Sequence, residues 1–398
     1  MTEFLKNRDA RRTRALRLSM AVMAATGAAP LSGCLTNGFE VIDGHVGNAV
    51  SMVSAPKAEP RRVPLFVAST RRGDGGQGDG RAHFSLIAVG VPQGHRAGVV
   101  ERPSFGAPDR HRHFTLLSRS ALDEDEFGAE VASHVSGRIG VARDILLYVH
   151  GFNTSLDEAR FRLAQIVADG RYPGVAAAFT WNSRGGLFAY EQDKEAATVS
   201  RDALEKLIVD LSHTPGVGRV HILAHSMGAW LTMEAMRSIA ISGHPDLDGR
   251  LGQIMLAAPD IDFTVFRQQV ARLDPSHVSI FVAGNDRALS LSSRIAGDRP
   301  RLGALDPGKS EEKAELDRLG VAVYDISSFS TDFVGHGAFA EAPDVVRQIG
   351  AQLTAPREGD AEKQANPDFR GDMQAAPAPP PPVARGVESQ PLAPLAAR

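Results

Sequence analysis

A serine with the setting of an activated nucleophile lies near the middle of the 398-residue chain. Ser226 stands in Ala224-His-Ser-Met-Gly228, between an apolar run at 220–224 that predicts a buried strand and a run of helical spacing that starts at Met227. A tight strand-to-helix turn needs small residues, because neighbouring backbones pass close to it, and it holds the serine hydroxyl away from the sheet. Ala224 departs from the G-x-S-x-G pattern of such turns, and an ordinary strand-to-helix turn is the alternative.

Two further residues follow later strands in the chain order that hydrolytic triads on this type of turn use. Asp286 ends Gly284-Asn-Asp286, and His336 lies within Gly335-His-Gly337. A serine hydroxyl is a weak nucleophile, so a histidine must take its proton and a carboxylate must orient that histidine. We therefore predict Ser226, Asp286 and His336 as the catalytic residues, with no metal and no cofactor.

Each partner also has a simpler interpretation. Asp286 is placed to cap a helix that begins close behind it, and His336 could be a loop histidine between glycines. Asp260 and Asp262, after the preceding strand, are rival acids, and we prefer Asp286. A protonated imidazole cannot act as a base, so activity is expected to fall on acidification.

A third strand end supplies the expected oxyanion hole. His150-Gly-Phe-Asn153 follows an apolar run at 145–149, and we predict that the N–H groups of Phe152 and Met227 stabilise the oxyanion. We interpret His150 as holding this loop and His225 as packing.

The substrate pocket is less well marked. Leu187, Phe188 and Tyr190 lie in a loop expected to overhang the site, and with Asn153 they are the candidate pocket residues. Core packing of the three apolar side chains is the alternative. If they form an acyl pocket, Phe188→Ala should change chain-length preference more than stability.

The order of elements favours an α/β fold. From Asp144 onward, apolar runs alternate with segments of helical spacing. Strands are expected at 63–68, 83–89, 113–117, 145–149, 175–181, 220–224, 253–258, 277–283 and 321–326. This alternation predicts a doubly wound, mostly parallel sheet of the α/β-hydrolase fold, with its site at the carboxyl ends of the strands.

Local signals refine that outline. Ser155-x-x-Glu158 is a capping box that should start a helix closed by Gly170. One helix is expected to carry the apolar face from Ala197 to Leu211. The acidic segment Asp123–Glu126 is expected to be a solvated loop. His111 and His113 form a His-x-His pair, which lacks a third metal ligand nearby.

The N-terminal residues resemble a bacterial lipoprotein signal. Basic residues up to Arg17 precede an uncharged run that ends in Leu31-Ser-Gly-Cys34. The resemblance implies cleavage before Cys34, acylation of Cys34 and a lipid-anchored protein in the bacterial cell envelope. Because Leu35 rather than an aspartate follows, it implies the outer membrane, facing the periplasm. A plain signal peptide with an incidental cysteine is the alternative.

These features divide the chain into four parts. We predict a lipoprotein-type signal peptide (1–34), a tether (35–60), an α/β-hydrolase domain (61–354) and a disordered tail rich in proline and alanine (355–398). The net charge of −3 and the lack of a basic stripe interleaved with aromatics give no indication of nucleic-acid binding. The expected partners are a small-molecule or lipid-like ester and, through Cys34, a membrane.

The motifs together resemble one family, the α/β hydrolases of the domain of unknown function 900 (DUF900). The resemblance covers residues 63–354, and its most specific stretches are Tyr148–Thr154 and Ala224–Gly228. Other matching stretches are 66–71, 90–95, 178–181, 257–262 and 285–289. Membership implies the fold and a site at Ser226, Asp286 and His336, but no substrate.

Three functions compete on this reading. The first is a serine hydrolase that cleaves a carboxylic ester or thioester through an acyl-enzyme. The second is a non-catalytic envelope scaffold or binding protein on the same fold, which the tether and tail suggest. The third is an acyltransferase or amidase with the same triad, because pocket shape rather than the triad selects the acceptor.

Overall fold

The structure is a computed structural model that describes residues 58–71, 78–184, 189–329 and 336–355, all within one compact unit, Pro56–Arg398. The predicted signal peptide, the tether up to residue 57 and the tail from residue 356 lie outside these described residues. The predicted domain boundaries therefore stay predictions.

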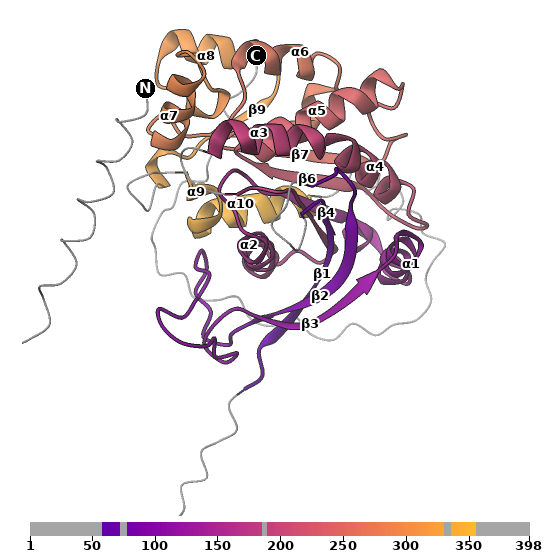
Figure 1. Ribbon diagram of the computed structural model, residues 1–398. Helices are drawn as coiled ribbons and strands as arrows, with labels where there is room; N and C mark the ends of the chain where they lie inside the picture. The colour runs from indigo at the N-terminus through magenta and orange to yellow at the C-terminus, as the bar shows by residue number, and fades with distance from the viewer. Residues whose placement is uncertain (1–57, 72–77, 185–188, 330–335, 356–398) are drawn as a thin grey trace, which may run out of the picture. The chain divides into compact units, whose positions relative to one another are not determined.

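The described residues form a nine-stranded, mostly parallel sheet in the order β3-β2-β1-β5-β4-β6-β7-β8-β9 (Figure 1). β2 alone runs against the others, because it pairs antiparallel with both β1 and β3. The strands are β1 (Arg61–Ser69), β2 (His83–Val91), β3 (Thr115–Leu122), β4 (Ile145–Val149), β5 (Val175–Thr180), β6 (Val220–His225), β7 (Leu251–Ala257), β8 (Val278–Val282) and β9 (Ala322–Asp325).

Helices cover both faces of this sheet. They are α1 (Glu124–Val135), α2 (Leu156–Asp169), α3 (Tyr190–Val199), α4 (Arg201–Ser212), α5 (Met227–Ile241), α6 (Phe263–Val270), α7 (Arg287–Ile295), α8 (Ser310–Asp317), α9 (Ala338–Glu341) and α10 (Pro343–Thr354). One apolar core lies under α1, α3, α4, α5 and α6, and a second lies under α2, α9 and α10. A mostly parallel sheet with helices on both faces is the predicted doubly wound architecture, so the predicted fold class is confirmed.

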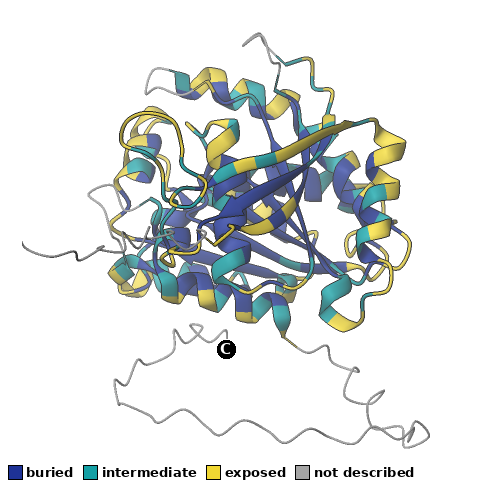
Figure 2. Ribbon diagram, turned by 90° about the horizontal axis from the view of Figure 1, so that it is seen from below, coloured by how far each residue is buried: buried dark blue, intermediate teal, exposed yellow. Residues whose placement is uncertain are grey.

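The central strands are apolar throughout because both of their faces are covered. Every residue of β4, β5 and β8 is buried, and Figure 2 shows the middle of the sheet dark blue between helices with exposed outer faces. Alternate residues of β6 serve the two cores: Val220, Ile222 and Ala224 face one, and Leu223 faces the other. This two-sided burial explains the continuous apolar runs in the sequence.

Pairing register brings the functional strand ends to one edge. Val149 of β4 pairs with Ala224 of β6, and His225 pairs with Ala257 of β7. Ala257 in turn pairs with Phe281 of β8. The segments that follow β4, β6, β7 and β8 therefore emerge side by side at the carboxyl edge.

Three local predictions were wrong. The strand expected at 113–117 runs from Thr115 to Leu122. The acidic segment Asp123–Glu126 is not a loop but the start of α1, because Asp123 and Glu126 form a reciprocal capping box. The single helix expected around Ala197–Leu211 is two helices that meet at Ser200, whose hydroxyl bonds Ala196 O and the Thr70 hydroxyl, each at 2.8 Å.

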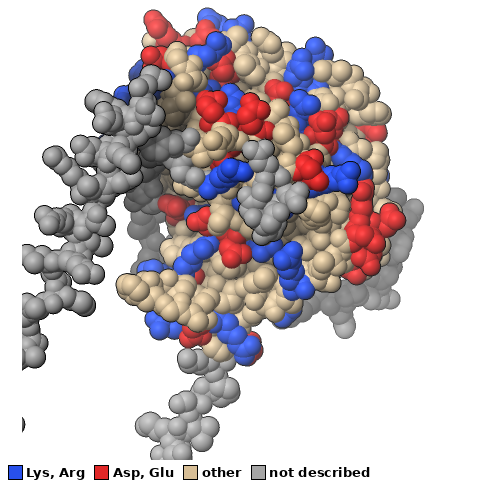
Figure 3. Space-filling view, in the orientation of Figure 1, with Lys and Arg blue, Asp and Glu red and all other residues tan. Residues whose placement is uncertain are grey.

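Charges of both signs are interspersed on the face shown in Figure 3. An acidic patch lies over α1, whose first turn carries Glu124, Asp125 and Glu126. A continuous basic stripe is the usual footprint of nucleic-acid binding. On this face, the basic side chains of the described residues form no such stripe.

Candidate active site

Ser226 forms a strained turn between β6 and α5. Its backbone dihedrals, φ 55° and ψ −123°, lie in a region that residues with a side chain rarely adopt. Its N–H donates to Ala257 O at 3.0 Å, which ties the turn to the neighbouring strand. Gly228 is needed because a Cβ there would lie 2.3 Å from His150 O. Ala224, by contrast, has no positive φ, so alanine meets the backbone requirement at that position.

Asp286 and His336 are in direct contact. His336 Nδ1 donates to Asp286 Oδ2 at 2.7 Å, which leaves Nε2 of the neutral ring as a proton acceptor. Asp286 Oδ1 accepts from Leu289 N at 3.0 Å, so the same carboxylate also caps α7. The side chain of Asp286 is fully buried and that of His336 is 20% exposed. Asp286 thus does both of the things that the sequence allowed: it caps a helix and it contacts His336.

The two rival acids are engaged elsewhere. Asp260 accepts hydrogen bonds from Tyr190 and Ser292 and lies 3.2 Å from Arg301 Nε. Asp262 caps α6 and pairs with Arg299 at 2.6 Å. Neither forms an ion pair with His336 among the described residues, whereas Asp286 does.

His225 supports the histidine loop, which goes beyond the simple packing role expected for it. Its ring stacks on Phe339 at 4.5 Å, and its centroid lies 4.6 Å from that of His336. Because a carbonyl can only accept, its Nε2–H donates to His336 O at 3.0 Å. Burial above all, and then the neighbouring titratable ring of His336, keep the pKa of His225 well below its ordinary value. His225, the residue that precedes Ser226, is therefore neutral. It holds the backbone of His336 by a hydrogen bond and lies against the His336 ring.

The loop after β4 packs tightly against the elbow. A Cβ on Gly151 would lie 2.8 Å from Ser226 Cβ and 2.9 Å from His225 Nδ1, so only glycine fits there without displacement. The two predicted oxyanion donors, the N–H groups of Phe152 and Met227, therefore belong to adjoining segments. Neither donates to a loop or turn carbonyl among the described residues.

His150 fixes this loop from the inside. Its ring is fully buried and stacks on Trp181 at 5.1 Å. Nδ1–H donates to Gly151 O at 2.8 Å, while Nε2 accepts the Trp181 backbone N–H at 3.1 Å. Burial and the charge of Arg71 lower the pKa of His150 to about 3, so the ring is neutral and its tautomer is set. The structural role expected for His150 agrees with this geometry.

Arg71 holds the loops after β4 and β5 in place, a role that the sequence did not predict. It follows β1 and donates to Thr154 O, to Ser183 O at 3.2 Å and to His150 Nε2 at 3.3 Å. It thereby joins the segments after three strands. Burial lowers the pKa of Arg71 to about 10, so the guanidinium is still charged at neutral pH. Its position at a strand end, next to a loop rich in glycine, was the only available signal.

Asn153 is held by its backbone. It has a positive φ of 53°, is exposed, and donates its N–H to Ser183 Oγ at 2.8 Å. Ser183 Oγ donates to the fully buried Asp193 at 2.5 Å, and Asp193 also accepts Arg184 N. Asp193 on α3 therefore anchors both the loop after β5 and the loop after β4.

The loop position predicted for Tyr190 was wrong. Tyr190 begins α3 and is buried. Its hydroxyl donates to Asp260 Oδ2 at 2.8 Å, and its ring packs edge-on against Phe152 at 5.7 Å. Burial, with the charge of Asp260, raises the pKa of Tyr190. These contacts fit the packing alternative better than a pocket wall. Leu187, Phe188 and Cys34 lie outside the described residues.

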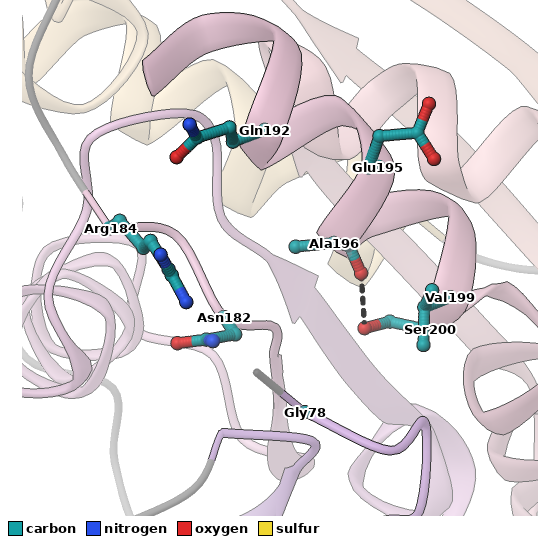
Figure 4. A pocket seen from close by; sticks show the side chains of 8 residues that line it. All are labelled: Gly78, Asn182, Arg184, Gln192, Glu195, Ala196, Val199 and Ser200. Carbon is teal, nitrogen blue, oxygen red and sulfur yellow. Dashed lines mark hydrogen bonds between the residues drawn. The ribbon is translucent and has the colours of Figure 1, made fainter. Parts of the chain in front are cut away.

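A cavity of about 330 Å³ lies between the loop after β5 and α3 (Figure 4). Asn182 and Arg184 lie on one side of it, and Gln192 and Ala196 of α3 lie on the other. None of the described lining residues is Ser226, Asp286 or His336.

The described residues contain no group of three histidine, cysteine or acidic side chains placed to hold a metal ion. Nδ1 of His113 instead accepts a turn N–H from Asp109, and His111 Nδ1 lies 3.1 Å from Ala58 O. In the same part of the chain, no helix combines the length and the apolar character needed to span a bilayer.

The sheet order and the serine turn define the class of the protein, which is that of the α/β hydrolases. Residues 123–357 match the family described as alpha/beta hydrolase of unknown function (DUF900). The chain belongs to this family, as its motifs predicted. The match begins at Asp123, so the predicted N-terminal stretches 66–71 and 90–95 fall outside it.

Solved structures show only distant likeness. One is a candidate cell surface hydrolase from Lactobacillus plantarum WCFS1, with 12% identity over 56% of this chain and 96% of that chain and a TM-score of 0.34. Another is an esterase from Pyrobaculum calidifontis, with 11% identity over 75% and 86% and a TM-score of 0.34. A lipase-esterase related protein from Clostridium acetobutylicum ATCC 824 has 12% identity over 52% and 82% and a TM-score of 0.23. No curated protein matches the chain. At these TM-scores the likenesses do not bear on the site.

Proposed function

We propose that this protein is a serine hydrolase that cleaves a carboxylic ester or thioester through an acyl-enzyme on Ser226. The observation that carries the proposal is the 2.7 Å bond between Asp286 and His336, whose ring lies against His225, the residue before a serine with the backbone of a nucleophile elbow. The neutral, supporting states of His150 and His225 leave His336 as the base.

In the first half-reaction, Ser226 Oγ forms a bond to the carbonyl carbon while its proton passes to His336 Nε2. Asp286 stabilises the resulting imidazolium. The N–H groups of Phe152 and Met227 stabilise the oxyanion, and one such donor is worth about 10²–10³ in rate. When the tetrahedral intermediate collapses, the bond to the alcohol or thiol breaks, and His336 returns the proton to the leaving group.

Water then completes the cycle. His336 takes a proton from water, whose oxygen bonds to the acyl carbon of the Ser226 ester. Collapse of this second intermediate releases the carboxylic acid and returns the proton to Ser226. No redox step occurs, and every proton removed is given back.

Hydrolysis of p-nitrophenyl esters of increasing acyl length by the full chain tests the proposal. We expect turnover that Ser226→Ala abolishes and that Ser242→Ala, at an exposed position at the far end of α5, leaves unchanged. Matched thioester and anilide substrates separate esterase from amidase chemistry. A folded wild type that turns over none of them contradicts the proposal and favours the scaffold alternative.

The acyl side of the pocket is a narrower proposal. Leu187 and Phe188 come shortly before Tyr190 in the sequence, and the ring of Tyr190 contacts Phe152 of the proposed oxyanion loop. We expect Phe188→Ala to change the preferred acyl length. An unchanged preference with lowered stability would instead assign Phe188 to the core.

Lipid anchoring is a separate proposal that depends on Leu31-Ser-Gly-Cys34. We propose that acylated Cys34 holds the protein in the cell envelope, at the outer membrane facing the periplasm, because multiple acyl chains give stable anchoring. Metabolic labelling with radioactive palmitate should mark the wild type and not Cys34→Ser. Equal labelling of both proteins would contradict it.

A further inference from the structure

A groove of about 480 Å³ lies next to the segment that follows His336, and its volume is within the range of about 300–1,000 Å³ typical of small-molecule sites. Its walls come from the segment between β2 and β3, from the first turns of α2, and from α9. The described lining residues are Gly98, Val99, Val100, Arg102, Glu158, Arg162 and Glu341.

The groove reaches the segment that carries His336. A Cβ on Gly337, the next residue, would lie 2.6 Å from Glu341 Oε1, so the Glu341 carboxylate is in contact with this segment. A Cβ on Gly98 would lie 2.1 Å from Glu341 O, so the opposite wall touches the same helix. A group bound in the groove would therefore lie close to Gly337, the residue that follows the proposed base His336.

The formal charges in the groove cancel, with two arginines and two glutamates. Arg162 Nη2 lies 3.2 Å from Glu341 Oε1. Glu158 Oε2 accepts Ser155 N at 2.7 Å, as part of the cap of α2. Arg102 forms no ion pair among the described residues, and its guanidinium lies 5.0 Å from the centroid of Phe161.

This arrangement selects the charge class of a ligand. An anion would face Glu158 and Glu341, and a cation would face Arg102 and Arg162. A hydroxyl both donates and accepts, so it can bond to a guanidinium and to a carboxylate without separating the pair. Several neutral hydroxyl groups are therefore the chemistry that the groove fits best.

The wall that carries Arg102 is firmly held. His95 Nδ1 lies 2.9 Å from Glu101 Oε2, and His95 Nε2 lies 2.8 Å from Asp169 Oδ1. Asp169 also accepts Gly98 N at 2.8 Å, which ties the groove wall to the end of α2. A wall held in place loses little freedom on binding, which favours a specific ligand.

We propose that this groove binds the alcohol part of the substrate, and that this part is a neutral, hydroxyl-rich group such as a sugar or another polyol. The inference rests on the proposed serine hydrolase function and adds the class of leaving group. Its position against Gly337, next to His336 in the chain, fits the step in which the departing oxygen takes a proton.

Five acetate esters test the leaving group on the full chain. We expect a higher kcat/KM for 6-O-acetylglucose than for hexyl acetate, which has the same carbon count in the alcohol but no further hydroxyls. Acetylcholine, 3-acetoxybutyrate and O-acetylserine supply a cation, an anion and a zwitterion. A preference for any of these three, or for hexyl acetate, overturns the inference.

A variant isolates the groove. Arg102→Gln should lower kcat/KM for 6-O-acetylglucose roughly ten-fold or more, which is the factor expected from one lost charge-assisted hydrogen bond. Hexyl acetate hydrolysis should not change. Arg272→Gln, an exposed arginine outside the groove, should alter neither. Equal loss on both esters would assign Arg102 to stability and contradict the inference.

A binding measurement separates this inference from the function it rests on. Titration of the full-length Ser226→Ala protein with 6-O-acetylglucose should give a calorimetric signal that the added Arg102→Gln change weakens. If p-nitrophenyl acetate is hydrolysed but the sugar ester neither binds nor reacts, the inference fails alone. If the wild type hydrolyses no ester while the sugar ester binds, the proposed function fails instead.

Discussion

Replacing Asp286 by asparagine or alanine should separate the two roles of this residue. Asp286 Oδ1 caps α7 and Oδ2 accepts from His336 Nδ1. Asparagine and aspartate are equally good helix caps, whereas alanine costs about 1 kcal/mol at this position. Asparagine also presents an N–H where His336 needs an acceptor, so the ring is driven to the tautomer that cannot take the serine proton.

The two variants should therefore lose similar activity and differ in stability. Asp286→Asn should keep Tm close to that of the wild type and lower kcat by about 10⁴, the size of effect known for this change in serine triads. Asp286→Ala should lose similar activity and, in addition, about 2–4 °C in Tm, because 1 kcal/mol corresponds to that shift in a domain of this size.

Thermal unfolding and initial rates on one p-nitrophenyl ester measure both quantities. If Asp286→Asn keeps more than a tenth of wild-type activity, Asp286 does not orient a catalytic histidine. If asparagine lowers Tm as much as alanine does, the carboxylate does not act as a cap through Oδ1.

Two more predictions follow from close packing and from a buried histidine. Gly151→Ala should destabilise the fold by about 1–3 kcal/mol through overpacking and lower kcat, because its Cβ would lie 2.8 Å from Ser226 Cβ; unchanged urea unfolding and unchanged kcat would refute this. Burial lowers the pKa of His95, but its bonds to Asp169 and Glu101 outweigh this and raise the pKa above its ordinary value. The contribution of protonated His95 to the free energy of unfolding is therefore complete below about pH 6.5 and is lost as the pH rises through the raised pKa of His95. The difference in unfolding free energy between wild type and His95→Gln should shrink between pH 6 and pH 9. A constant difference would show that His95 acts without its charge.

The sequence was sufficient for the elements whose signals are local. The apolar runs placed the central strands within a few residues, and Ser155 with Glu158 marked the start of α2. Asp123 and Glu126 have the same spacing and start α1 in the same way, although the acidic composition of the segment indicates a solvated loop.

The contacts that hold the site were not predictable in the same way. Arg71, Ser183 and Asp193 act across distances of ten to more than a hundred residues, and no pattern along the chain reports that Arg71 reaches His150. Tyr190 looked like a pocket residue because it is aromatic and close to a turn. Its hydroxyl finds Asp260, seventy residues away, and only the folded sheet brings the two together.

The central claim is that Ser226 is a nucleophile activated by His336. The most direct test is to treat the full chain with a fluorophosphonate and to map the adduct by peptide mass spectrometry. We predict one adduct per chain, on Ser226, formed at a rate that falls by orders of magnitude in His336→Gln. A folded protein that gains no adduct, or gains it on another residue, would contradict the assignment of this site.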